Sequence, residues 1–149
     1  MPKIPEGFST ITPGLVVKDA AKAIELYKKA FGAKEDYRME GNEKGKIMHA
    51  CLTVGNSKIF LADADPKTAC MAPTASTFYV YVDNVDASFK QAQGAGLKEL
   101  YPLQDMFWGD RTGSFEDGFG NHWTLATHVR EVSPQEMEEA KKNWGKKAA

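Results

Sequence analysis

Hydrophobic and polar positions in the first half of the chain predict a strand, a helix and three further strands. Residues 11–17 favour a strand, and Asp19 behind them suits a helix N-cap, because its carboxylate can accept from the free amides of a first turn. Apolar side chains then recur at every third or fourth position as far as Gly32, which is typical of an amphipathic helix and its C-terminal end. The further strands are predicted at residues 34–40, 46–54 and 57–62.

The pattern starts again after a proline-containing linker at residues 63–75. A second amphipathic helix begins behind the capping pair Asp83-Asn84 and ends near Gly94 and Gly96. Strands are predicted around it at residues 76–82, 98–103, 109–116 and 122–129. The second half therefore repeats the element order of the first.

An offset of 65 residues superposes the two halves. The offset aligns Thr12 with Thr77, Val17 with Val82, Ile24 with Phe89, and Gly55-Asn56 with Gly120-Asn121. Since neither half would bury its apolar face alone, we expect the halves to pack together. The predicted fold class is α+β, with paired βαβββ modules at residues 9–63 and 76–130 that form a U-shaped mixed sheet within a single domain, residues 1–149.

A C-terminal helix is predicted at residues 133–145. Ser133 is its N-cap, Pro134 its first residue, and Glu136 completes a capping box. Met137, Ala140 and Trp144 form a narrow apolar stripe. We expect this stripe to dock on its own domain or on a partner subunit.

Strand alternation sorts side chains onto two faces. In the strand at residues 46–54, the core face is predicted at Met48, Ala50, Leu52 and Val54, and the mixed face at Ile47, His49, Cys51 and Thr53. In the later strands, the core face is predicted at Phe78, Val80, Val82, Trp123 and Leu125, and the mixed face at Thr77, Tyr79, Tyr81, His122, Thr124 and His128. A polar and aromatic face that lines a concavity suits a ligand site.

Composition argues against several function classes. A net charge of −1 provides no field to hold a polyanion, so nucleic acid is not an expected partner. No segment approaches the roughly 20 apolar residues of a membrane span, and the first residues lack the apolar stretch of a signal peptide. We therefore expect a cytoplasmic protein with no membrane partner, in which Cys51 and Cys70 are reduced thiols.

Several segments together resemble a known group of proteins. They are Thr12-Pro13, residues 30–33, residues 46–50, Phe107-Trp108-Gly109-Asp110-Arg111 and Asp117-Gly118-Phe119-Gly120-Asn121-His122-Trp123. They resemble the PhnB-like branch of the glyoxalase/bleomycin resistance/dioxygenase superfamily, also called vicinal oxygen chelate, over about residues 11–129. Gly14 and Gly118 depart from the pattern of that branch, and these departures affect backbone stiffness more than chemistry. The resemblance implies the paired βαβββ fold, a homodimer, and pockets in U-shaped sheets.

Metal-dependent members of that superfamily carry His or Glu on four equivalent strands. The resemblance places these positions at Thr12, Ile59 or Phe60, Thr77 and Thr124. A hydroxyl is a weak ligand, and an aliphatic or phenyl side chain is none, so no cofactor is expected and the metal-dependent glyoxalase I and extradiol dioxygenase reactions are set aside. A divalent metal remains an alternative only at an unorthodox site made of His49, Cys51 and His122.

The remaining candidates are assigned to a ligand-binding site. They are His49, Cys51, Thr77, Tyr79, Phe107, Trp108, Arg111, His122 and Thr124. His49 is the first candidate for a ligand contact or a general base, because an imidazole exchanges protons near neutral pH. Trp108 is expected to stack on a flat ligand and Arg111 to pair with an anionic group. The alternative for Arg111 is a clamp with Asp105 or Asp110 that fixes the loop.

Tyr79 and Tyr81 either donate hydrogen bonds to a ligand or are ordinary sheet aromatics, and Asp117 is expected to cap the turn at Gly118. The predicted function is a metal-independent small-molecule binding protein. It would hold a partly aromatic or anionic ligand in the concave pocket of a homodimer, in the manner of bleomycin-resistance members. The alternatives are a lyase, isomerase or transferase of the same superfamily with an atypical metal site or none, and a structural dimer with a vestigial pocket.

Overall fold

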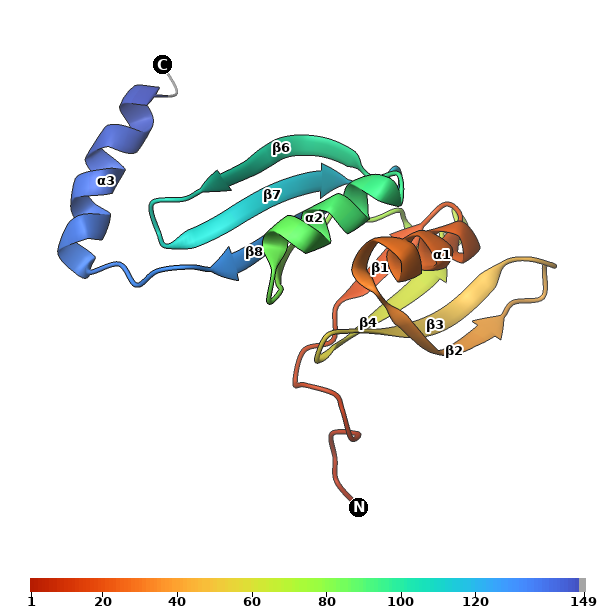
Figure 1. Ribbon diagram of the computed structural model, residues 1–149. Coiled ribbons are helices and arrows are strands. Elements are labelled where there is room, and N and C mark those ends of the chain that lie inside the picture. Colours follow the sequence, from red (N-terminus) through yellow and green to blue (C-terminus); the bar gives the residue numbers. More distant parts are fainter. Residues whose placement is uncertain (148–149) are drawn as a thin grey trace.

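A computed structural model describes residues 1–147 of the chain (Figure 1). The last two residues of the predicted domain 1–149 lie outside the described residues. Three α-helices, one short 3-10 helix and eight strands make up the described part. Their bounds are β1 Gly14–Val17, α1 Ala20–Phe31, β2 Lys34–Glu40, β3 Ile47–Val54, β4 Ser57–Asp63, η1 Ala69–Met71, β5 Thr77–Tyr81, α2 Val85–Gly94, β6 Lys98–Asp105, β7 Asp110–Glu116, β8 His122–His128 and α3 Pro134–Lys147.

The two halves have the same sheet topology. The first sheet has the order β1-β4-β3-β2 and the second the order β5-β8-β7-β6. In each sheet the first strand pairs in parallel with the last, and the other pairs are antiparallel. The α+β class and the βαβββ order predicted from the sequence are confirmed, and the eight strands form two separate four-stranded sheets.

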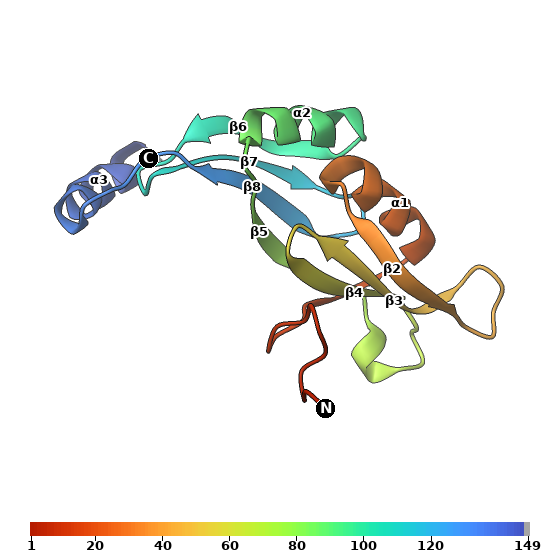
Figure 2. The same cartoon turned by 60° about the horizontal axis from the view of Figure 1, so that its bottom comes forward.

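Both long helices of the modules begin and end at the residues that the sequence indicated. The Asp19 carboxylate accepts from the amide of Lys22 at the start of α1, and Gly32 ends that helix with a φ of 65°. The Asn84 side chain caps α2 in the same way by accepting from the amide of Ala87. The helices lie side by side on one side of the sheets, and the N-terminal segment lies on the other (Figure 2).

The junction between the modules is built around Trp123 of β8. Its ring lies 4.6 Å from those of both Phe31 and Phe78, so it joins the core of the first module. The buried carboxylate of Asp117 accepts hydrogen bonds from the Trp123 indole (3.0 Å) and from the Tyr27 hydroxyl (2.6 Å). The same carboxylate accepts from the amides of the following turn, as the sequence predicted for Asp117.

One face assignment in β3 was wrong. Met39 pairs with His49 and Glu40 with Ile47, so Met48 is the extra residue of a β-bulge. The bulge reverses the faces to which Met48 and the residue before it point. Met48 is therefore 56% exposed, whereas Ile47 is 2% exposed and belongs to the core. Ala50 and Leu52, beyond the bulge, are buried in the core as expected.

The C-terminal helix α3 projects from the second sheet (Figure 1). Its predicted capping box is confirmed, because the Glu136 amide donates to the Ser133 hydroxyl and the Ser133 amide to the Glu136 carboxylate, at 3.1 and 2.8 Å. Trp144 packs edge-on against Phe107, at 5.2 Å between ring centroids. Across residues 1–147, no helix has the length and apolar character needed to cross a membrane.

Candidate functional site

The mixed face of the second sheet carries the densest group of polar and aromatic side chains. Strand register places Tyr79 opposite Thr124, and Thr124 opposite Ser114, whose hydroxyl lies 2.8 Å from that of Thr124. Tyr81 lies opposite Ala126, whose small side chain leaves room for the phenol to reach over β8 towards β7. This face is therefore the polar and aromatic surface that alternation predicted.

Asp110 is the centre of this group. Its carboxylate is 2% exposed and accepts hydrogen bonds from the hydroxyls of Tyr79 (2.7 Å) and Tyr81 (2.9 Å). Burial alone would raise the pKa of Asp110, but the hydrogen bonds from Tyr79, His128 and Tyr81 outweigh it and hold this pKa below its usual range. Asp110 is therefore an ionised, buried carboxylate at neutral pH.

His128 is the third partner of Asp110. Its Nδ1 lies 2.8 Å from one carboxylate oxygen, and its Nε2 lies 3.4 Å from the carboxylate of Glu131. The hydrogen bond with Asp110 raises the pKa of His128, and Glu131 adds to the effect. Because the ionised carboxylate only accepts, Nδ1 carries the proton, and Nε2, beside Glu131, is the nitrogen that gains or loses a proton when His128 titrates.

The four-residue network of Asp110, Tyr79, Tyr81 and His128 was missed from the sequence. Asp110 had been considered only as a partner of Arg111, and His128 only as a member of the mixed face. The alternation of Tyr79 and Tyr81 was a usable signal for that face. No local pattern connects them to a carboxylate 29 to 31 residues away.

Trp108 extends the network on its aromatic side. Its indole N–H donates to the Tyr79 hydroxyl at 3.2 Å, and its ring meets that of Phe107 edge-on at 5.0 Å. Gly109 permits this arrangement, because its φ of 101° is unfavourable for other residues and a Cβ there would collide with the Arg130 carbonyl. The loop thus holds both aromatic candidates beside the network.

Arg111 lies on the opposite face of β7. Its guanidinium donates two hydrogen bonds to Asp86 of α2, at 3.0 and 3.1 Å, and one to Asp105 at 3.2 Å. These two carboxylates raise the pKa of Arg111. The Asp105–Arg111 clamp considered in the sequence analysis is therefore present, and Arg111 fixes the loop against α2.

The candidates of the first sheet form a separate group. His49 lies 2.9 Å from the Tyr37 hydroxyl through Nε2, and its ring packs on Phe60 at 4.6 Å. Cys51 is buried, and its thiol donates to Asp36 at 3.7 Å. Burial raises the pKa of the Cys51 thiol, and the Asp36 charge adds to this.

His122 and Thr77 face each other at the far end of the second sheet, where both are exposed. His49 and Cys51 belong to the first sheet. Among the side chains of the described residues, no three His, Cys, Asp or Glu groups gather in a way that would hold a metal ion.

The structure also decides between Ile59 and Phe60 at the metal-equivalent position of β4. Ile59 is buried in the core, whereas Phe60 pairs with Cys51 and packs at a tilt against His49, so Phe60 is the residue on the mixed face. A phenyl ring at this position and threonines at the other three do not fit a divalent metal, which prefers imidazole, carboxylate or thiolate ligands.

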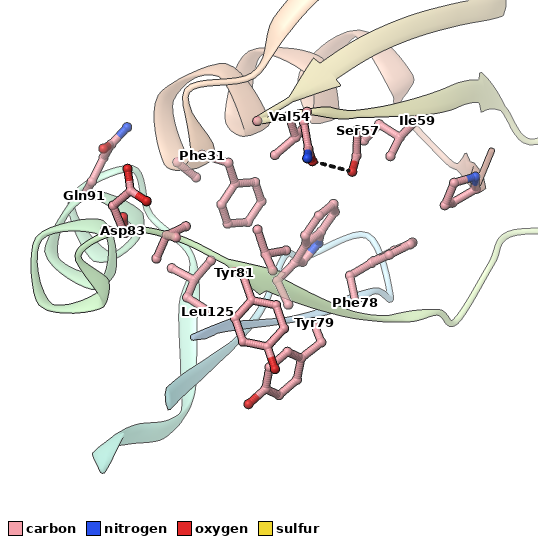
Figure 3. Close-up of a pocket in the computed structure, with 18 residues that line it drawn as sticks. Phe31, Val54, Ser57, Ile59, Phe78, Tyr79, Tyr81, Asp83, Gln91 and Leu125 are labelled. Atoms are coloured by element: carbon pink, nitrogen blue, oxygen red, sulfur yellow. Dashed lines mark hydrogen bonds between the residues drawn. The ribbon is translucent and has the colours of Figure 1, made fainter. Parts of the chain in front are cut away.

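A groove of about 680 Å³ runs along the seam between the modules (Figure 3). Phe31, Phe78, Trp123 and other apolar side chains line it. Its polar lining residues are Asn56, Ser57, Asp83, Ser88 and Gln91. Tyr79 and Tyr81 of β5 also border the groove, but their rings project side by side from the face of β5 opposite to Phe78, toward Asp110.

Comparison with known proteins agrees with this fold. A family model described as the Glyoxalase/Bleomycin resistance protein/Dioxygenase superfamily matches residues 8–125. The chain belongs to this superfamily. An uncharacterized protein of Mycobacterium bovis is 40% identical over 143 residues, which cover 91% of this chain and 93% of that protein.

Solved structures of the superfamily show the same fold. TioX from Micromonospora sp. ML1 is 27% identical with a TM-score of 0.69, and the match covers 81% of this chain and 99% of that chain. A PhnB protein from Bacillus cereus is 20% identical with a TM-score of 0.62, covering 80% and 99% of the two chains. The second likeness concerns the fold alone.

Proposed function

We propose that this glyoxalase-superfamily chain binds a small, partly aromatic organic molecule without a resident metal ion. The observation that carries the proposal is the residue content of the mixed faces. Where metal-dependent members carry His or Glu, this chain has Thr12, Phe60, Thr77 and Thr124. Beside these positions, the second sheet instead has phenols, an indole and a buried carboxylate that suit direct contact with an organic ligand.

The groove supports the proposal by its size and lining. About 680 Å³ lies within the range of small-molecule pockets, and its lining is apolar with a few polar groups. The groove borders β5, which pairs with β8 on one side only in the part of the chain that the structure describes. We infer that a second copy of the chain covers this edge, so that the ligand is held within a homodimer.

A fluorescence titration tests the binding function. Aromatic probes of differing charge should change the tryptophan emission saturably, with micromolar dissociation constants. Trp108→Phe should reduce this response, because Trp108 contacts Tyr79 at 3.2 Å, and Trp123, which lines the groove, should account for the remainder. Trp144→Phe is the matched control and should retain the response.

Metal analysis completes the test. Protein purified without chelator should contain far less than one equivalent of zinc, nickel, manganese or iron. A stoichiometric metal that is lost on His49→Ala would contradict the proposal, as would a flat emission response to every probe class.

A second candidate function is an isomerase, lyase or transferase that needs no metal. The Asp110–His128 pair favours it, since a carboxylate that holds Nδ1–H leaves Nε2 able to accept a proton. Conversion of a bound ligand that disappears in His128→Gln, while the ligand still binds, would establish this function instead of binding alone.

A further inference from the structure

The direction of the hydrogen bonds around Asp110 limits what the two tyrosines can offer to a ligand. An ionised carboxylate has no proton, so each phenol must donate its own O–H to Asp110. Asp110 is ionised at neutral pH because its hydrogen-bond partners hold its pKa below the usual range. Both hydroxyl protons therefore point inward, and the phenol oxygens present lone pairs to the outside.

The Trp108 indole uses part of this accepting capacity by donating to Tyr79. Tyr81 receives no such bond among the described contacts and is 65% exposed as a residue, so its oxygen keeps its capacity to accept from a ligand. The rings of Tyr79 and Tyr81 lie 5.2 Å apart between centroids, and the Trp108 indole meets the Tyr79 hydroxyl beside them. Accepting oxygens, aromatic faces and a buried negative charge all favour a positively charged hydrogen-bond donor.

The residues that line the groove also favour a cation over an anion. Of its lining residues, all of which lie within the described part of the chain, none is basic and one, Asp83, is acidic. The nearby guanidinium of Arg111 faces α2, where Asp86 and Asp105 bind it. Neither the groove nor Arg111 therefore offers a cation to an anionic ligand, and the imidazole of His128, the partner of Asp110 that can carry a positive charge, is already held between Asp110 and Glu131.

We propose that the Tyr79–Tyr81–Asp110 surface selects organic cations, with a protonated amine or amidinium group at the phenol oxygens and an apolar or aromatic body against the neighbouring aromatic rings. This inference rests on the proposed binding function and narrows its ligand class. Of the partly aromatic or anionic ligand expected from the sequence, it keeps the aromatic character and replaces the anionic alternative with a cationic group.

Three probes of nearly equal shape test the inference. Benzamidine is a cation at neutral pH, benzamide is neutral and benzoate is an anion. Isothermal titration of the full chain at pH 7.5 should give a dissociation constant for benzamidine that is at least tenfold lower than for either other probe, since hydrogen bonds to a charged donor are the stronger ones. Benzoate should bind most weakly.

Asp110→Asn should remove most of the preference for benzamidine and leave benzamide binding within about threefold, because the substitution removes the charge and keeps the shape. Asp86→Asn is the matched control: it removes the same charge on the opposite face and should keep the preference. Circular dichroism verifies folding. If Asp110→Asn does not fold, Tyr81→Phe serves instead, and it should weaken benzamidine alone by roughly three- to tenfold.

Two results would overturn the inference while the binding function stands: benzoate or benzamide binding as tightly as benzamidine, or an unchanged preference in both Asp110→Asn and Tyr81→Phe. If none of the three probes binds at millimolar concentration, the proposed binding function fails for aromatic ligands and the inference falls with it.

Discussion

At the scale of single residues, buried carboxylates determine the polar structure of this protein. Asp110 and Asp117 are both almost fully buried, and each accepts hydrogen bonds from side chains of other strands or helices. A buried charge is costly unless hydrogen bonds replace its lost hydration, so each carboxylate fixes the side chains around it. Asp117 joins the two modules, and Asp110 fixes the positions of the side chains in the candidate site.

The Asp110–His128 pair predicts a pH-dependent contribution to stability. The raised pKa of His128 means that its contribution is complete below the unfolded pKa of histidine, about 6.5, and is lost as the pH rises through the folded pKa. The lowered pKa of Asp110 means that its contribution is present above about 4 and is lost as the pH falls further. The pair therefore stabilises the fold most between these two values.

His128→Gln should thus destabilise the protein at pH 5.5 and have a much smaller effect at pH 9, measured by urea unfolding at each pH. Glu131→Gln is the control for the second carboxylate and should have the smaller effect, since Glu131 is exposed and its contact with His128 is longer. An equal loss of stability at both pH values would show that the pair makes no protonation-dependent contribution.

At the scale of elements, close contacts between a helix and its sheet fix the distance between them, which secondary-structure propensity does not determine. Gly113 of β7 lies directly under Phe89 of α2, and a Cβ there would overlap the phenyl ring. Phe89 also packs on Phe115 at 4.6 Å between ring centroids. The distance between α2 and its sheet therefore depends on a residue without a side chain.

Gly113→Ala should destabilise the protein by about 1–3 kcal/mol, because the added methyl group overpacks this contact. Thermal or urea unfolding measures the loss, and Phe89→Leu in the same chain should recover part of it. Gly94→Ala is the control: nothing lies within 4 Å of a Cβ at that helical position, and alanine should stabilise by up to about 1 kcal/mol. A Gly113→Ala protein as stable as the parent would contradict this packing.

At the scale of the whole molecule, the two modules meet through their helices and the Trp123 junction, while their mixed faces belong to separate sheets. The edge strand β5 and the apolar groove beside it lie at this seam. Apolar surface next to an open strand edge favours association with another chain, and closed symmetric pairs are the commonest outcome.

Sedimentation should therefore show a dimer of the 16.4 kDa chain at micromolar concentration. Dilution to nanomolar concentration should release monomers, and a saturating aromatic ligand should shift the transition to lower protein concentration if the pocket lies at the interface. A monomer throughout the micromolar range, with and without ligand, would rule out this assembly.

Local patterns in the sequence were enough to predict the elements, their order and the duplication. Caps at Asp19 and Ser133, the helix end at Gly32 and the strand alternation around Phe78 and Trp123 all depend on neighbours within a few residues. Local features of this kind can be recognised in the sequence because the interacting groups are close along the chain. The sequence alone therefore determined the fold class, most of the core and the aromatic character of the mixed face.

Only the tertiary structure decided which side chains act together. The Met48 bulge exchanged the faces of β3, Arg111 turned to α2, and Asp110 accepted hydrogen bonds from residues 18 to 31 positions away. These outcomes depend on strand order, register and the packing of a helix on the sheet, all of which result from packing and hydrogen bonding between residues far apart in the sequence. The direction of a hydrogen bond, and with it the charge that a site prefers, is set only when those distant partners meet.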